Sequence, residues 1–158
     1  DIIGEWWTIL IIREAFFGTR RFEDFQQHLG IARNILTTRL RKLCDHGVLQ
    51  RVPVKEGARR HEYRLTAMGR DLYPTLIAMT QWGDRWLNDN RPPVKFVEHQ
   101  TGEEIADVAI MSNDKRVLDA RDLVLQPGPG ATDETRARLK LLHEAWLAHQ
   151  KERQQEEG

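Results

Sequence analysis

Residues 31–43 constrain the fold more than any other stretch, because their spacing predicts one amphipathic helix with an unusual polar face. The apolar residues share one side of a helical wheel: Ile35, Leu36, Leu40 and Leu43. The opposite side carries Asn34, Thr37, Thr38 and Arg41, with Lys42 at its edge. Asparagine pairs with adenine, arginine with guanine, and a threonine methyl group contacts the thymine methyl group. On these residues alone, a base-reading helix and an ordinary basic surface helix fit equally well.

The segments on either side favour the base-reading helix. Residues 2–17 predict a helix buried on more than one side, and residues 22–29 predict a short helix that Gly30 ends. Two helices with a turn between them, the second polar on its outer face, form the helix-turn-helix pattern. Two short alternating runs, 48–54 and 61–66, then enclose a basic turn and predict a β-hairpin, which is a wing in this context.

The basic residues of this region are placed to meet phosphate groups. The chain of 158 residues has a formal net charge of zero, yet segment 18–60 holds 10 basic and 4 acidic residues, a local +6. Phosphate contact depends on the charge of one face rather than on the total. We expect phosphate or wing contacts from Arg20, Arg21, Lys42, Lys55, Arg59 and Arg60. An ordinary solvated hairpin tip is the alternative for the last three.

Thr66 is expected to cap a long helix that runs to about Asp89 and carries a wide aromatic stripe. The stripe could pack against the first helix or lie in a dimer interface, where tryptophan is enriched. The residues expected in a dimer interface or an effector pocket are Trp6, Trp7, Leu76, Met79, Trp82 and Trp86. For the tryptophans, an aromatic core is favoured over an effector pocket.

The predicted helices and strands, and the loop-forming residues between them, indicate two domains and an α+β fold. The first, residues 1–90, is a winged helix-turn-helix domain for DNA binding and dimerisation. Arg91-Pro92-Pro93 marks the boundary, and residues 91–158 form an extension. That extension is expected to be rich in β-structure, with three short strands within 94–126 followed by a C-terminal helix over 132–152.

In order and spacing, residues 4–83 resemble the HxlR-type winged-helix transcriptional regulators of bacteria. The matching segments are Gly4-Glu5-Trp6-Trp7, Gly18-Thr19-Arg20-Arg21-Phe22, Leu36-Thr37-Thr38-Arg39-Leu40-Arg41-Lys42-Leu43, Gly47-Val48-Leu49, Tyr63-Arg64-Leu65-Thr66 and Trp82-Gly83. The resemblance implies a homodimer held by the first and last helices of the domain, with recognition helices in successive major grooves. The sequence departs from the family at Glu5, where a lysine is usual, and at Ala32, a poor cap where serine is frequent.

No catalytic or metal-binding constellation is visible, so we expect neither an enzyme nor a cofactor. The single cysteine, Cys44, lies near His46, but a nucleophile needs a third, orienting group and a redox switch needs a lowered pKa and exposure. A half-buried, small hydrophobic residue is the favoured interpretation. The cysteine-rich, zinc-ribbon-like element of some longer family members has no cysteine here, so a zinc site is not expected.

These observations predict a cytoplasmic, homodimeric regulator that binds double-stranded DNA at a palindromic operator. Charged residues interrupt the apolar stretch 2–17, which is too short to span a bilayer, so no membrane partner is expected. The sequence neither requires nor excludes the binding of a small-molecule effector. The alternative function is a winged-helix protein-interaction module whose C-terminal extension binds a partner or a small effector.

Overall fold

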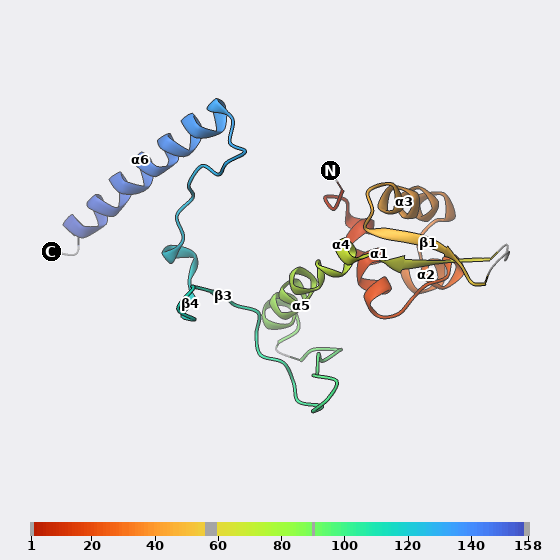
Figure 1. Cartoon of the computed structure of the whole chain (residues 1–158). Coiled ribbons are helices and arrows are strands. Elements are labelled where there is room, and N and C mark those ends of the chain that lie inside the picture. Colours follow the sequence, from red (N-terminus) through yellow and green to blue (C-terminus); the bar gives the residue numbers. More distant parts are fainter. Residues whose placement is uncertain (1, 56–59, 90, 157–158) are drawn as a thin grey trace. The chain divides into compact units, whose positions relative to one another are not determined.

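The computed structural model describes residues 2–55, 60–89 and 91–156, which belong to two compact units, Asp1–Val108 and Ala109–Gly158. The first unit opens with α1 (Trp6–Phe16), α2 (Phe22–Leu29), α3 (Arg33–Asp45), β1 (Leu49–Pro53) and β2 (His61–Leu65). The three helices gather beside the hairpin (Figure 1). This arrangement is a winged helix-turn-helix, and it confirms the expected α+β class.

The core of the first unit is formed by the apolar faces of α1, α2 and α3 and by the start of β1. The fully buried hydrophobic residues are Ile11, Ile12, Phe25, Ile31, Leu36, Leu40, Leu43, Val48 and Leu49. Gly30 ends α2 with a φ of 61°, a left-handed conformation that turns the chain sharply into α3. Because α3 buries its leucines in this core, its polar face is left on the outside of the unit.

The hairpin is fastened to the helices by both its strands. β1 and β2 pair antiparallel, with Leu49 opposite Leu65 and Arg51 opposite Tyr63. The Tyr63 ring meets the ring of Phe25 edge-on, with 6.4 Å between centroids, and the Tyr63 N–H donates to the Arg20 carbonyl at 2.8 Å. The wing is therefore held against α2 and the loop that precedes it.

The helix expected from Thr66 to Asp89 is two helices, α4 (Ala67–Arg70) and α5 (Tyr73–Leu87). Thr66 does cap the first of them, because its hydroxyl oxygen accepts from the Gly69 N–H at 3.1 Å. The break falls just before Pro74, in the first turn of α5. Proline has no N–H to continue a helical ladder and is best tolerated in a first turn, which explains why a new helix starts there.

Residues 91–108 belong to the first unit, whereas the sequence led us to expect a boundary near Arg91. They are tied to α5 by side-chain hydrogen bonds. The Gln81 amide donates to the Ala106 carbonyl at 3.2 Å and accepts from the Val108 N–H at 2.8 Å. Arg85 adds an ion pair to Asp107 at 2.5 Å. The extension therefore begins by packing along α5. Figure 1 draws α5 in green.

The three strands expected within 94–126 are far shorter in the structure. An isolated bridge joins Val97 to Glu104, and the only two named strands after β2 in the described residues are β3 (Ile110–Met111) and β4 (Val117–Leu118). A 3-10 turn, Ala120–Asp122, interrupts the last predicted strand. Long strands need an apolar layer against one face, and the apolar side chains here are largely exposed. The C-terminal helix is present as α6 (Asp133–Glu156).

Candidate nucleic-acid interface

The polar face of α3 is exposed along the middle of the helix. Asn34, Thr37, Thr38 and Arg41 are all solvent-exposed, as their positions on the wheel predict. The Thr37 hydroxyl donates to the Arg33 carbonyl at 2.8 Å, and that of Thr38 donates to the Asn34 carbonyl at 3.0 Å. Each hydroxyl proton is thus used within the helix, so the threonines keep a methyl group and an acceptor oxygen for an outside partner.

The other two polar side chains of this face, Asn34 and Arg41, make no side-chain hydrogen bond or ion pair within the described part of the chain. An amide and a guanidinium group that are exposed in this way carry several donors ready for an outside acceptor. The α3 face therefore combines two free polar groups with two apolar methyl groups, which is the mixture that base edges in a major groove can satisfy.

A carboxylate from the residue before α1 holds the inner edge of α3. Glu5 forms ion pairs with Arg39 and, at 3.3 Å, with Lys42. Arg39 is therefore engaged within the protein, while Lys42, expected to meet phosphate, also faces a protein carboxylate. Desolvation acts to raise the pKa of Glu5. The hydrogen bonds and positive charges of Lys42 and Arg39 outweigh it and hold this pKa below its ordinary value.

The N-terminus of α3 lacks a side-chain cap, as Ala32 predicts. Ala32 occupies the N-cap position and makes no side-chain hydrogen bond there. Arg33 begins the helix, and its guanidinium lies 4.8 Å from the centroid of the Phe22 ring, a cation–π contact with α2. The first turn therefore keeps free backbone N–H groups beside a fixed positive charge, a combination that suits an anion.

A basic hollow lies between α2, the start of α3 and the wing. It measures about 620 Å³, and four arginines line it, Arg21, Arg33, Arg51 and Arg60, against two acids, Glu23 and Asp24. Arg33 and Arg51 were not among the residues that the sequence led us to expect at phosphate. Their positions did carry a signal, because Arg33 precedes the polar face of α3 by one residue and Arg51 lies in the strand that leads to the basic turn.

The remaining cationic residues expected to meet phosphate lie on the surface. Arg20, Lys55 and Arg60 are exposed, and the Arg60 carbonyl accepts from the Val54 N–H at 3.1 Å, which continues the hairpin toward its tip. Arg59 lies outside the described residues. Within the described chain, the cations therefore lie on the wing and on the loop before α2.

The aromatic stripe of α5 is not part of the core, so the favoured core interpretation is wrong for Trp6, Trp82 and Trp86, whereas Trp7 does pack against the core. Trp82 and Trp86 are 58% and 69% exposed, and Trp6, at the start of α1, is 78% exposed. Met79 is also exposed, whereas Trp7 and Leu76 are half-buried against the core. The error came from treating α5 as packed lengthwise on α1. Only the N-terminal part of its apolar face, at Leu72 and Leu76, reaches the core.

Cys44 has the environment of a small hydrophobic residue, as predicted. It is half-buried against the core, and burial, followed by the neighbouring charge of Asp45, raises the pKa of its thiol. His46 Nδ1 lies 2.8 Å from the Lys42 carbonyl oxygen. The histidine is thus engaged by the backbone, which leaves this pair without the arrangement of a nucleophile and its base.

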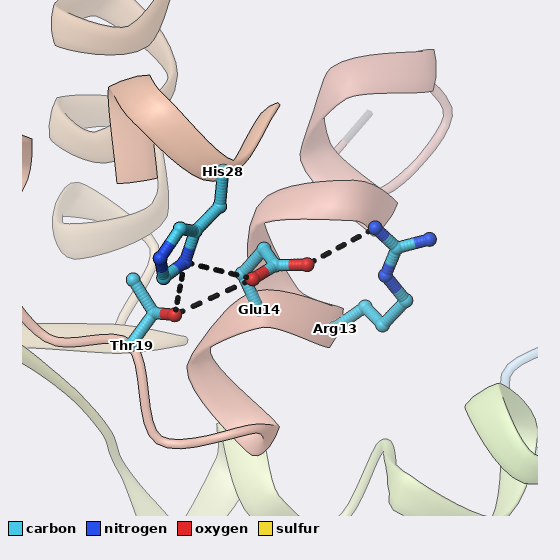
Figure 2. A network of polar contacts seen from close by, with 4 residues as sticks. All are labelled: Arg13, Glu14, Thr19 and His28. Carbon is cyan, nitrogen blue, oxygen red and sulfur yellow. Dashed lines mark hydrogen bonds and ion pairs between the residues drawn. The ribbon is translucent and has the colours of Figure 1, made fainter. Parts of the chain in front are cut away.

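A polar network joins α1 to α2 behind the interface (Figure 2). The carboxylate of Glu14 is buried in α1 and pairs with Arg13 at 3.0 Å. Its other oxygen accepts from the Thr19 hydroxyl at 3.3 Å and lies 3.4 Å from Nδ1 of His28, which belongs to α2. Because Thr19 Oγ1 also lies 3.1 Å from that nitrogen, the three side chains fix the angle between α1 and α2.

The part of the chain that the structure describes holds neither a candidate metal site nor a membrane-spanning helix. No group of three or more histidine, cysteine or acidic side chains in these residues is arranged to hold a metal ion. Among the same residues, no helix combines the length and the hydropathy needed to cross a bilayer.

A helix-turn-helix with a polar second helix, followed by a two-stranded wing beside a basic hollow, defines a winged helix-turn-helix protein. The chain belongs to the HxlR-like helix-turn-helix family, whose model matches residues 2–91. It is 44% identical over 131 residues to an uncharacterised HTH-type transcriptional regulator of Mycobacterium tuberculosis, Rv3095, covering 82% of this chain and 83% of that one. The chain is accordingly a transcriptional regulator with a helix-turn-helix domain.

Solved structures agree over nearly the same span. PA1607, described as a candidate transcription factor, has a TM-score of 0.74 at 40% identity, covering 81% of this chain and 90% of that one. PA1374 of Pseudomonas aeruginosa, described in the same terms, has a TM-score of 0.63 at 38% identity, covering 86% and 93%. Both matches reach beyond the winged helix into the extension, so the extension is part of what these proteins share.

Proposed function

We propose that the protein binds double-stranded DNA in a sequence-specific way, with α3 in the major groove and the wing on the adjacent backbone. The observation that carries the proposal is the exposed polar face of α3, in which Asn34 and Arg41 have no partner of their own among the described residues. In this arrangement Asn34, Thr37, Thr38 and Arg41 read base edges. Arg20, Arg21, Lys55, Arg59 and Arg60 contact phosphate.

Two additions to the sequence-based assignment follow from the contacts described above. Arg33 and Arg51 join the phosphate-contacting set, because they line the same hollow as Arg21 and Arg60. Lys42 makes a smaller contribution than the others, since the Glu5 carboxylate already partners its ammonium group.

The experiment is selection of bound duplexes from a random-sequence pool, followed by binding assays on the selected site at several salt concentrations. We expect one enriched motif. Arg41→Ala should relax the preference at the positions that this side chain reads and cost roughly 1–3 kcal/mol in binding. The matched control is Arg116→Ala, an exposed, ion-paired arginine of the second unit. Unchanged sequence preference in Arg41→Ala would remove Arg41 from the base-reading set.

We further propose that the protein acts as a homodimer on a palindromic operator. Trp6, Met79, Trp82 and Trp86 are large apolar side chains that a single chain leaves exposed, and aromatic side chains of this kind concentrate in interfaces. Sedimentation analysis of the wild type and of Trp82→Glu tests this. A dimer that the substitution converts to a monomer supports the proposal, whereas a wild-type monomer at operator-binding concentrations refutes it.

A protein-interaction module is the second candidate, and one observation favours it. In the second unit, Leu125 and Leu141 are 73% and 67% exposed, which leaves apolar surface for a partner. The same selection experiment separates the two functions, because an interaction module would enrich no duplex sequence. The salt dependence of binding to random-sequence duplex gives an independent answer.

A further inference from the structure

A pocket inside the first unit is distinct from the DNA-facing surface. It lies between the C-terminal end of α1, the first half of α5 and residues 94–97, and its volume is about 470 Å³. Ligand pockets commonly measure roughly 300–1,000 Å³. The walls are mainly apolar, and the aromatic side chains Phe16, Tyr73 and Phe96 are among the residues that line them. A planar ring therefore finds more surface here than in the polar hollow beside the wing.

The wall formed by residues 94–97 is held in place by its own hydrogen bonds. The Phe96 carbonyl accepts from the Ile105 N–H at 3.0 Å, and Val97 pairs with Glu104 in an antiparallel bridge. Lys95 forms an ion pair with Glu104 at 2.7 Å. This part of the extension thus closes one side of the pocket, which gives residues 91–108 a role that the winged helix alone cannot supply.

The charged side chains that line the pocket are both cations. Arg13 and Lys95 contribute to the wall, and no acidic side chain of the described residues does. Arg13 is 42% exposed and pairs with Glu14 through Nη2 alone; its Nε is buried without a hydrogen-bond partner. A guanidinium group has five N–H donors, so most of those on Arg13 are unused. An apolar pocket with spare cationic donors and no acid complements a ligand that has one anionic end.

We propose that this pocket binds a small aromatic carboxylate, with its ring against Phe16, Tyr73 and Phe96 and its carboxylate on Arg13. The same guanidinium pairs with Glu14, whose other oxygen is engaged by Thr19 and His28 (Figure 2). A bound carboxylate competes with Glu14 for Arg13, and the contacts between Glu14 and α2 change in response. The pocket is thereby coupled to the first helix of the helix-turn-helix; only the consequence for DNA rests on the proposed function.

Calorimetric titration of the full chain with 2-naphthoate tests the binding step. We expect saturable binding, and the neutral analogue 2-acetylnaphthalene should bind about tenfold more weakly or worse, because it cannot form a charge-assisted hydrogen bond with Arg13. Arg13→Gln should weaken 2-naphthoate binding to a similar degree, and Phe96→Ala should weaken both ligands. The matched control is Arg116→Gln, which removes an exposed, ion-paired arginine from the second unit.

Three results would overturn the binding step. The first is no saturable binding of 2-naphthoate or of benzoate, and the second is equal affinity for the neutral analogue. The third is unchanged binding in Phe96→Ala, which would place the ligand elsewhere. Because Arg13→Gln also alters Glu14, the thermal unfolding of each variant without ligand is measured alongside. Phe96 is not one of the four side chains of the network, so its variant separates ligand loss from a disturbed network.

Hydrogen exchange of the amides of α2 tests the coupling without any DNA. Saturating 2-naphthoate should change exchange across Phe22–Leu29 in the wild type, and His28→Asn should reduce that change while leaving ligand affinity intact. Ligand binding with unaltered α2 exchange would refute the coupling and leave the site in place. A protein that binds 2-naphthoate but no duplex would instead refute the proposed function alone.

Discussion

Replacing Gly69 by alanine tests how closely α4 packs against the turn that follows α3. Gly69 is buried, and a Cβ built there would lie 2.2 Å from the Val48 backbone oxygen and 3.0 Å from Cδ2 of Leu65. The Val48 oxygen cannot simply retreat, because it accepts from the Thr66 N–H at 3.1 Å. Thr66 in turn caps α4 through the Gly69 N–H. The added methyl group therefore presses on the junction that follows α3.

The magnitude follows from two opposing terms. Overpacking of a closely packed site costs about 1–3 kcal/mol. Alanine in a helix recovers about 0.5–1 kcal/mol relative to glycine, because it restricts the unfolded chain. The free energy of unfolding should therefore fall by about 1–2 kcal/mol. For an m-value of roughly 2 kcal/mol per molar urea, the middle of the usual range for small proteins, the unfolding midpoint falls by about 0.5–1 M.

Urea unfolding at fixed protein concentration measures this change, since association would otherwise shift the midpoint. The control is Gly128→Ala, where a Cβ meets no heavy atom within 4 Å and φ lies outside the left-handed range. Its midpoint should equal that of the wild type or rise slightly. If Gly69→Ala unfolds at or above the wild-type midpoint, then α4 does not pack on Val48 as closely as described, and the joint between α3 and α4 is looser.

Three further predictions concern charge and reactivity. Lys55→Ala should lower the salt slope of DNA binding by about one unit, in an assay on one duplex at several salt concentrations, because one phosphate contact is lost. At neutral pH the wild type should be more stable to unfolding than Glu5→Gln, because the pKa of Glu5 is lowered in the folded protein. This difference in unfolding free energy should shrink as the pH falls below the ordinary glutamate pKa and vanish below the lowered pKa of Glu5. Denaturation curves recorded across the acid range will show it. Cys44 should react with iodoacetamide far more slowly in the native protein than in urea, followed by mass spectrometry, because burial shields the thiol and raises its pKa. Equal rates in the two states would contradict the half-buried position.

The helix-turn-helix and its wing could be predicted from the sequence because local pattern and tertiary packing agree there. The leucines of α3 recur at helical spacing and are the residues that the core buries. Gly30 falls where the chain must turn. The break between α4 and α5 was predictable too, since Pro74 forbids a continuous helical ladder at that point. The expected helix over 66–89 gave too little weight to that one residue against an unbroken apolar stripe.

The extension could not be predicted in the same way. Its apolar runs have the composition of strands, but a strand of useful length forms only where a second strand and a covering layer are both present. In the structure, Val97 pairs with Glu104 alone, and Ile110–Met111 pairs with Val117–Leu118 over two residues. The contacts that organise residues 91–108 come instead from polar side chains of α5, such as Gln81. No periodic pattern in the sequence predicts that a glutamine forms hydrogen bonds with two backbone groups some 25 residues away.

The charged side chains of the candidate interface are unevenly distributed between α3 and the region around the wing. On α3, Arg39 and Lys42 are both engaged by Glu5, so Arg41 is the residue of the polar face that offers an unpaired positive charge within the described structure. Four arginines converge instead at the hollow beside the wing. In the proposed binding mode, nonspecific attraction to phosphate arises chiefly from the wing and the hollow, whereas the polar face of α3 contributes mainly neutral groups that discriminate between bases. Substitutions in the two regions should accordingly change different observables, the salt slope for one and the preferred sequence for the other.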